Sequence, residues 1–332
     1  MFDVLVFIAS VGPVVAKENL LEAIYTISKN IGECNYKFYI VVDDLDNLVS
    51  YEFKSGKVHK QVPITKRFVR EIFENKVLSK VVKKNSLLEV VHTRGPWYKD
   101  FNYFVEKYKD DTKYFLVTHD DVVLNTDNFY NRAVKEIEGY EDEIGWIVCT
   151  NDRSWDISDG PRSDTTTSGF HTDREDRFRF ECHNFELGQK LTDDNKHLLD
   201  LPKRTVKCHG PLDFNLVSSK ALQLIGPAAD FGPYTMLLNE DWALESLKNN
   251  LINIWIPDIF ITHPNKRHKR DTDFDLRFEK HSHDKFHEKW GFYPHEGYTS
   301  SVIKILQNEY KETNIPWSSY RKTYEWDYLK DE

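Results

Sequence analysis

The first part of the chain alternates between apolar runs and stretches with helical spacing. Residues 3–9 form a continuous apolar run that leads into Ser-Val-Gly-Pro at 10–13, which is typical of a buried parallel strand entering a loop. Residues 20–31 repeat Leu and Ile at a period near 3.6, and Gly32 is placed to end the helix. A second apolar run covers 36–42. The order strand, helix, strand predicts the start of an α/β fold.

The alternation continues as far as residue 149. Further helices are expected at 66–82, 98–108 and 128–137, and further strands at 87–91, 114–118 and 145–149. Strands that alternate with helices of this length require a mainly parallel sheet covered on both faces. We therefore expect an α/β fold with a Rossmann-like, mostly parallel central sheet flanked by helices.

Residues 151–207 interrupt this pattern, because Asp, Arg, His, Ser and Thr dominate there and aliphatic residues are few. We interpret the segment as an insertion rather than part of the core. A long polar loop beside a ligand-binding edge often serves as a lid or a binding surface, and we expect this one to become ordered when a ligand binds.

The alternation resumes after the insertion. The expected elements are a strand and short helix at 210–225, a helix at 239–247, apolar strand segments at 252–256 and 259–262, and two further helices at 281–293 and 300–310. The predicted organisation is a single domain at 1–265 followed by a C-terminal helical and aromatic extension at 266–332.

The composition is that of a folded protein with a large core, since 40% of the 332 residues are hydrophobic and 14% are aromatic. A net charge of −9 argues against nucleic acid as the main partner. The basic run at 266–270 could meet a phosphate or an anionic surface, but such runs usually face water. The sequence shows neither a basic leader nor eighteen consecutive apolar residues, so we expect neither secretion nor a transmembrane segment.

The cysteines indicate the compartment. They are widely spaced and contain no Cys-x-x-Cys pair: Cys34, Cys149, Cys182 and Cys208. Neither a disulfide scaffold nor a thiolate zinc site is indicated, and the two Cys-His pairs at 182–183 and 208–209 match no common tetrahedral zinc pattern. The expected location is the cytoplasm, with peripheral contact at a membrane surface left open.

Carboxylates follow two of the apolar strands. The strand at 114–118 runs into His119, Asp120 and Asp121, and the strand at 36–42 runs into Asp43 and Asp44. In open α/β sheets ligands bind at the carboxyl ends of the strands, so these side chains are expected along one ligand-binding edge. Such clustering is costly unless a cation or hydrogen-bond donors bind there. A turn or a helix cap is the alternative interpretation of the Asp120-Asp121 pair.

Two further ionisable positions come later. Glu240 and Asp241 open the helix at 239–247, where the positive end of the helix dipole favours a carboxylate, so a capping role is the alternative. The last apolar strand segment ends at His263, whose alternative is an ordinary structural histidine.

Together these pieces resemble a family 2 glycosyltransferase with a GT-A fold. The resemblance spans roughly 3–265, as one catalytic domain, and lies in the order of its parts: Asp43-Asp44, His119-Asp120-Asp121, Glu240-Asp241-Trp242 and then His263. His119-Asp120-Asp121 stands where the family has Asp-x-Asp, and the Leu-Asp at 45–46 replaces the common Gly-Ser after the second strand. These departures concern the role of His119 and of the nucleotide-binding loop.

The resemblance implies transfer of a sugar from a nucleotide-sugar donor, with a UDP-sugar favoured, to a glycan or other glycoconjugate hydroxyl. A divalent cation, Mn²⁺ or Mg²⁺, would neutralise the leaving diphosphate. The implied metal ligands are Asp121, His263 and His119. The residues implied to bind the donor are Ser10, Asp43, Asp44, Arg94, Asp120 and Gly210.

Asp241 resembles the general base that removes the acceptor proton on the side opposite the leaving diphosphate. Direct displacement of this kind inverts the anomeric configuration. Glu240 would support or orient the site, and Glu240 itself as the base is left open.

Three other classes of protein fit the sequence less well. A sugar-phosphate nucleotidyltransferase usually carries a Gly-rich basic loop after its first strand, and the segment 10–13 is not one. A Rossmann oxidoreductase requires Gly-x-Gly-x-x-Gly, which is absent from the sequence. A non-catalytic glycan-binding module would use Trp97, Trp155, Trp242 and Trp290 as stacking surfaces, but it has no need of both Asp121 and Asp241.

Overall fold

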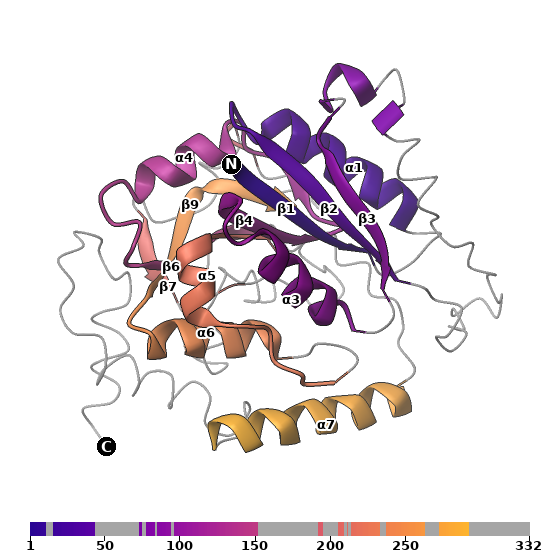
Figure 1. Ribbon diagram of the computed structural model, residues 1–332, viewed down its shortest axis with the longest axis vertical. Helices are drawn as coiled ribbons and strands as arrows, with labels where there is room; N and C mark the ends of the chain where they lie inside the picture. The colour runs from indigo at the N-terminus through magenta and orange to yellow at the C-terminus, as the bar shows by residue number, and fades with distance from the viewer. Residues whose placement is uncertain are drawn as a thin grey trace.

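A computed structural model describes residues 1–10, 16–43, 73–74, 78–83, 85–93, 96–151, 192–194, 205–208, 211, 214–232, 237–262 and 272–291. The strands are β1 (Phe2–Ser10), β2 (Tyr36–Asp43), β3 (Leu87–Thr93), β4 (Thr112–His119), β5 (Val123–Leu124), β6 (Ile144–Asn151), β7 (Val206–Cys208), β8 (Phe214–Ser218) and β9 (Ile252–Thr262). The helices are α1 (Ala16–Asn30), α3 (Trp97–Tyr108), α4 (Phe129–Glu136), α5 (Ser219–Ile225), α6 (Leu238–Lys248) and α7 (Thr272–Trp290). Figure 1 shows the strands as one central sheet with helices on both sides.

The sheet has the order β3-β2-β1-β4-β8-β6-β9-β5, with β7 attached to β9. The four strands from β3 to β4 are parallel, so their carboxyl ends share one edge. Beyond β4 the pairing is mixed, because β8 runs antiparallel to β4 and β6 while β6 and β9 are parallel. The expected α/β class with a helix-flanked central sheet is confirmed. Fully parallel pairing is confined to the half of the sheet that contains β1.

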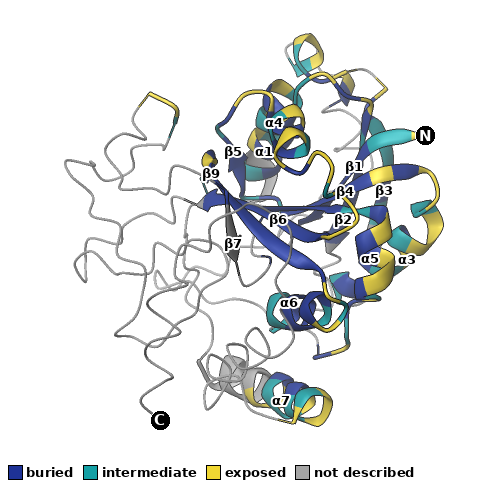
Figure 2. Cartoon of the chain, turned by 90° about the vertical axis from the view of Figure 1, so that its left-hand side faces the viewer, coloured by how far each residue is buried: buried dark blue, intermediate teal, exposed yellow. Residues whose placement is uncertain are grey.

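Side chains that alternate along the strands form two separate cores. On β1, Val4, Val6 and Ile8 point into the core beneath α1 and α4, whereas Leu5 and Phe7 point into the core beneath α3, α5 and α6. This is the period of two expected of a strand buried on both faces. In Figure 2 the central strands β1, β2, β4 and β6 are correspondingly mostly dark blue, and the outer faces of the surrounding helices are exposed.

Local sequence signals set the ends of the short helices. The Ser218 hydroxyl accepts a hydrogen bond from the Ala221 amide at 3.0 Å and so caps α5. Gly226, with φ of 87°, ends α5 in a conformation that residues with a Cβ rarely adopt. The Ser218 cap thus fixes where β8 passes into α5, and Gly226 fixes where α5 ends.

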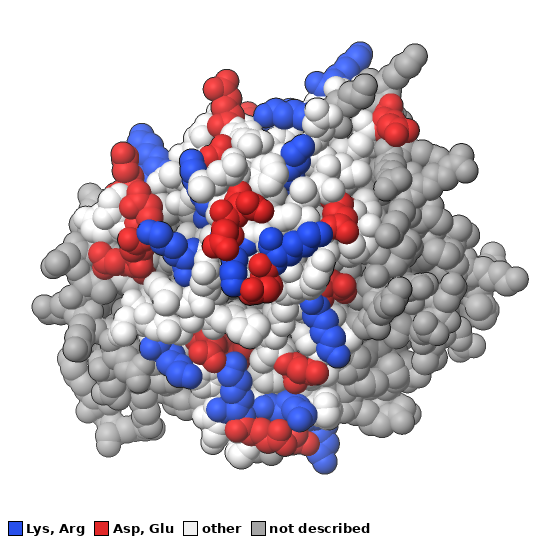
Figure 3. All heavy atoms as spheres, in the orientation of Figure 1, with Lys and Arg blue, Asp and Glu red and all other residues white. Residues whose placement is uncertain are grey.

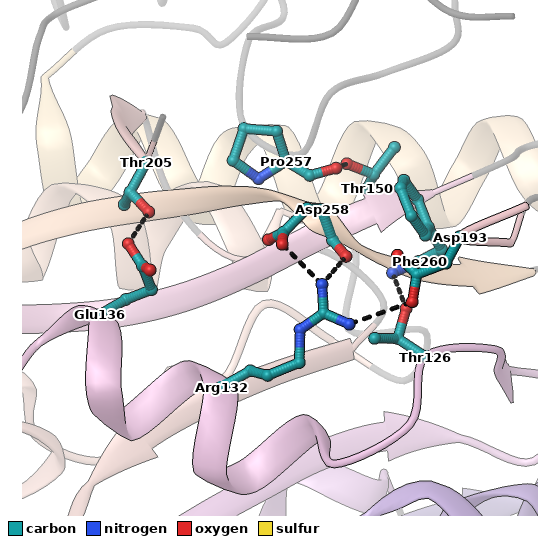
Figure 4. A network of polar contacts seen from close by, with 9 residues as sticks. All are labelled: Thr126, Arg132, Glu136, Thr150, Asp193, Thr205, Pro257, Asp258 and Phe260. Atoms are coloured by element: carbon teal, nitrogen blue, oxygen red, sulfur yellow. Dashed lines mark hydrogen bonds and ion pairs between the residues drawn. The ribbon is translucent and has the colours of Figure 1, made fainter. Parts of the chain in front are cut away.

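Polar contacts tie α4 to β9 (Figure 4). The Arg132 guanidinium donates to the backbone carbonyl of Asp258 at 2.7 Å and forms ion pairs with the carboxylates of Asp258 and Asp193. The Phe260 amide donates to the buried Thr126 hydroxyl at 2.7 Å. Exposed ion pairs of this kind each contribute roughly 0–1 kcal/mol, so the network serves chiefly to hold the α4 layer against β9.

Several elements differ from the sequence expectations. The two-residue β5 and three-residue β7 carry no pattern long enough to predict, and β7 arises within the segment interpreted as an insertion. The two strand segments expected at 252–262 form the single strand β9, and the helix expected at 281–293 begins earlier, at Thr272. The helix expected at 300–310 lies outside the described residues, as does most of 66–82 and of 151–207.

The surface shown in Figure 3 carries acidic and basic side chains interspersed with one another. The expectation from net charge that nucleic acid is not the main partner stays a prediction. In the described part of the chain, no helix combines the length and the apolar character needed to cross a membrane.

Candidate functional site

The parallel half of the sheet brings the predicted acidic turns to one edge. The register pairs Ser10 with Val42 and Asp43 with Thr93, and it pairs Ala9 with His119. The Asp120 amide then donates to the Ala9 carbonyl at 3.1 Å, so the chain stays beside β1 for one residue past the end of β4. The carboxyl ends of β1, β2, β3 and β4 therefore lie in a row.

Ser10 and Asp120 meet each other at this edge. The Ser10 hydroxyl donates to Asp120 Oδ2 at 2.6 Å, and the two residues are only 2% and 4% exposed. Because a buried carboxylate is costly without donors, this bond stabilises the turn that follows β4. The resemblance implied that both residues bind the nucleotide-sugar donor. The structure shows them bonded to one another, which fixes the backbone on which Asp121 sits.

Asp121 is half-buried and belongs to a turn that is anchored on its far side. The next strand, β5, pairs with the last residues of β9, with Val123 opposite Thr262. The side-chain Nδ2 of Asn30 donates to the Leu124 carbonyl at 2.6 Å. The side-chain Nδ2 of Asn125 donates to Thr262 Oγ1 at 2.8 Å. The end of β9 is thus held next to the segment that follows Asp121.

The donor set for a cation is incomplete within the described residues. Asp121 and the half-buried His119 are two candidate ligands at the end of β4, and a carboxylate oxygen is a ligand that suits Mn²⁺. No group of three His, Cys, Asp or Glu side chains that could hold a metal is found among the residues that the structure describes. His263 follows Thr262 directly in the chain but lies outside those residues. Two candidate ligands are fewer than a metal site requires, so the metal site stays a prediction.

Trp97 connects this edge to α6. Its ring lies 6.3 Å from the His119 ring and 6.3 Å from the Trp242 ring, in each case edge to face. Trp242 is 1% exposed and packs on Trp146 with ring centroids 4.9 Å apart. Trp242 is therefore a core residue and offers no sugar-stacking surface. The half-buried Trp97, which the sequence interpretation treated only as a possible sugar-stacking residue, lies between the strand edge and the helix that carries Asp241.

Asp241 lies in the first turn of α6 and is fully buried. Its Oδ1 accepts hydrogen bonds from Lys289 Nζ at 2.6 Å and from Trp290 Nε1 at 2.8 Å. Lys289 also pairs with Glu245 Oε1 at 2.8 Å. The other oxygen, Oδ2, has no hydrogen-bond partner within the described part of the chain.

Burial raises the pKa of the Asp241 carboxyl above its ordinary value, although the contacts with Lys289 and Trp290 act to lower it. Burial also acts to lower the pKa of Lys289, but its two carboxylate partners outweigh this effect and leave the pKa raised. A carboxylate with a raised pKa is a stronger base than an exposed aspartate. The arrangement can therefore accept a proton at Oδ2 while Lys289 balances the charge.

The remaining candidates are placed only in part. Glu240 is half-buried in the turn of α6 that holds Asp241, and only the backbone of Asp43 is described. The other candidates lie outside the described residues: Asp44, Arg94, Gly210 and His263. Sequence reasoning missed Lys289 as a partner of Asp241, since nothing in the local pattern links the C-terminal helix to α6.

No known family model and no curated protein matches the sequence. Among solved structures, the chain is similar to GalNAc-T7 with UDP, GalNAc and Mn²⁺, at 10% identity, over 93% of this chain and 55% of that one, with a TM-score of 0.49. It is also similar to the mannosyltransferase PcManGT from Pyrobaculum calidifontis in complex with GDP-Man and Mn²⁺, at 13% identity, over 92% and 74% of the two chains, with a TM-score of 0.46. The chain thus spans about half the length of the first protein. The nucleotides and Mn²⁺ are properties of those two proteins.

Proposed function

We propose that this chain is a glycosyltransferase with a GT-A fold that moves a sugar from a nucleotide-sugar donor to a hydroxyl acceptor. The observation that carries the proposal is the placement of two acidic positions on connected elements. Asp121 lies at the carboxyl end of the parallel sheet, and Trp97 links that edge to the helix that carries Asp241. A glycan-binding module needs no such pair, and Trp242, one of its expected stacking surfaces, is buried in the core.

The strand arrangement supports the donor side of this proposal. The order β3-β2-β1-β4, with all carboxyl ends at one edge, is the arrangement in which open α/β sheets bind nucleotides. Asp43 would contact the nucleotide from the end of β2, together with Asp44, Arg94 and Gly210. A UDP-sugar is the donor we propose.

The metal side rests on Asp121, with His119 and His263 as further ligands. When bound, Mn²⁺ or Mg²⁺ would neutralise the charge that develops on the leaving diphosphate. Ser10 and Asp120 act here through the backbone, because their mutual hydrogen bond fixes the turn that presents Asp121. We propose that these two residues position the donor site and that Asp121 binds the cation.

The acceptor side rests on Asp241. In the proposed step the acceptor oxygen forms a bond to the anomeric carbon, the bond from that carbon to the diphosphate breaks, and the acceptor proton moves to Asp241 Oδ2. A single displacement of this kind inverts the anomeric configuration. Glu240, in the same turn of α6, would orient the acceptor. Because Asp241 is fully buried, the acceptor can reach Oδ2 only after the side chains packed against Asp241 move apart.

The test is a panel of UDP-hexoses, UDP-N-acetylhexosamines and GDP-mannose, each with Mn²⁺, Mg²⁺ or EDTA. Binding of a donor together with its metal stabilises the folded state by mass action, so the melting temperature should rise only with both present. The same donor should release its nucleoside diphosphate slowly to water. A wild-type protein that neither binds nor hydrolyses any of these compounds would contradict the proposal.

A further inference from the structure

The C-terminal helix α7 delivers two donors to the same oxygen of Asp241. Lys289 Nζ lies 2.6 Å and Trp290 Nε1 lies 2.8 Å from Oδ1. Oδ2 of the same carboxylate is buried and has no partner among the described residues. Buried polar atoms in folded proteins are nearly always hydrogen-bonded, so an unpaired carboxylate oxygen beside a doubly bonded one requires an explanation.

Contacts other than this ion pair also hold α7 in place. Phe286 is fully buried with Phe231, Leu244 and Leu247, and the Phe286 and Phe231 rings lie 5.7 Å apart. The buried Ser282 hydroxyl donates to the Phe231 carbonyl at 2.7 Å. Apolar packing and this hydrogen bond dock the helix, and the last turn of α7 then brings Lys289 and Trp290 to α6.

Lys289 is also placed to balance two carboxylates. It lies 2.8 Å from Glu245 Oε1, one helical turn after Asp241 on α6. Without a cation between them, Asp241 and Glu245 would repel each other in a buried setting. Lys289 offsets this repulsion and holds Asp241 by Oδ1.

We propose that Lys289, assisted by Trp290, is a positioning residue that holds Asp241 by Oδ1 and leaves Oδ2 to take the acceptor proton. This inference rests on the proposed function and deepens it, because it makes the C-terminal helix part of the acceptor half of the site. The contrasting possibility is that the ion pair only fastens α7 to α6.

The test combines Lys289→Met, Lys289→Arg and Asp241→Asn in a double-mutant cycle, with Lys285→Met as the matched control. Lys285 lies one turn earlier on α7 and pairs with Glu288 on the surface. Turnover is read as Mn²⁺-dependent hydrolysis of the best nucleotide sugar in the panel, and donor affinity is read as UDP binding with Mn²⁺ by calorimetry. Urea unfolding reports the folded fraction of each variant.

We expect Lys289→Met to reduce turnover per folded molecule by at least about tenfold, a part of the full contribution of a general base. UDP affinity should stay unchanged, Lys289→Arg should restore most of the turnover, and Lys285→Met should have no effect. Lys289→Met added to Asp241→Asn should cause no further loss, because the two residues act as one unit. If Lys289→Met alone does not fold, the double variant should still fold, because Asp241→Asn removes the buried carboxylate that Lys289→Met leaves without its cation.

Three results would overturn the inference. If Lys289→Met changed the stability but not the turnover, the ion pair would serve only to attach α7 to α6. Equal losses from Lys289→Met with and without Asp241→Asn would show that Lys289 does not act through Asp241. Full turnover in Asp241→Asn would show that Asp241 is not the general base, although glycosyl transfer itself would stand. A wild-type protein that hydrolyses no donor would instead contradict the proposed function.

Discussion

The two regions that carry Asp121 and Asp241 are held in place by different kinds of contact. The turn that carries Asp121 follows directly from the strand register and from the hydrogen bond between Ser10 and Asp120. The surroundings of Asp241 come instead from α7, whose Trp290 is 49 positions further along the chain. The donor half of the proposed site is therefore a property of the sheet, and the acceptor half is a property of helix packing. Substitutions in one half should leave the other half intact.

The largest effect is expected in the half formed by the sheet. Asp121→Ala should reduce Mn²⁺-dependent UDP binding below detection, because a direct metal ligand contributes more than the outer-shell partners whose loss alone costs roughly 10–100-fold. The fold and the contact between Lys289 and Asp241 should be unaffected. Calorimetry with UDP and Mn²⁺ measures the affinity, and the exposed Asp127→Ala in the same connecting segment is the control. Unchanged affinity in Asp121→Ala would remove Asp121 from the metal site.

The next effect belongs to the half formed by helix packing. Asp241→Asn should lower turnover by ~10²–10⁴-fold, or ~3–5 kcal/mol on the barrier, since a general base contributes about that much. Donor and metal affinity should stay near the wild-type values, because the amide has the same shape and Lys289 keeps Glu245 as a partner. An equal loss of donor binding would place Asp241 in the donor half. A drop of only a few fold would move the base to Glu240.

The pH dependence of turnover tests the role of Lys289 at Asp241. Burial raises the pKa of Asp241, while Lys289 and Trp290 lower it and Glu245 raises it. The ionised base is protonated as the pH falls through this raised value, so the acid limb of the rate profile should lie above the ordinary aspartate pKa of about 3.9. Lys289→Met removes an influence that lowers the pKa and should move the limb to higher pH. A limb that stays in place would show that Lys289 does not act on the titrating group.

The smallest effect is expected on stability at the strand ends. Ser10→Ala leaves the buried Asp120 carboxylate without its hydroxyl donor and should lower the free energy of unfolding by ~1–3 kcal/mol. Ser86→Ala is the matched control, since Ser86 is equally buried but donates to the neutral Lys83 carbonyl, and should cost ~0.5–1.5 kcal/mol. Urea denaturation compares the two. A smaller loss for Ser10→Ala than for Ser86→Ala would contradict the anchoring role of Asp120.

The same difference explains what the sequence could predict. The apolar runs of β1, β2 and β4 are long enough to show burial on both faces, and their ends could be placed at one edge by the rule for parallel sheets. The two residues of β5 and the three of β7 are too short to carry a pattern, because their positions are set by pairing with β9. The contact between Lys289 and Asp241 depends on how α7 docks, which local periodicity does not encode. The bond between Ser10 and Asp120 likewise joins residues 110 positions apart.

The most direct test of the central claim is the stereochemistry of the product. A donor found in the panel, for example a UDP-α-hexose, is incubated with the protein and Mn²⁺, and proton NMR follows the anomeric signal of the released or transferred sugar before it equilibrates. A single displacement assisted by Asp241 predicts that the β-anomer forms first, and that it forms at the greatly reduced rate in Asp241→Asn. Formation of the α-anomer first would contradict direct displacement by an activated hydroxyl, whatever the effect of the substitution on the rate.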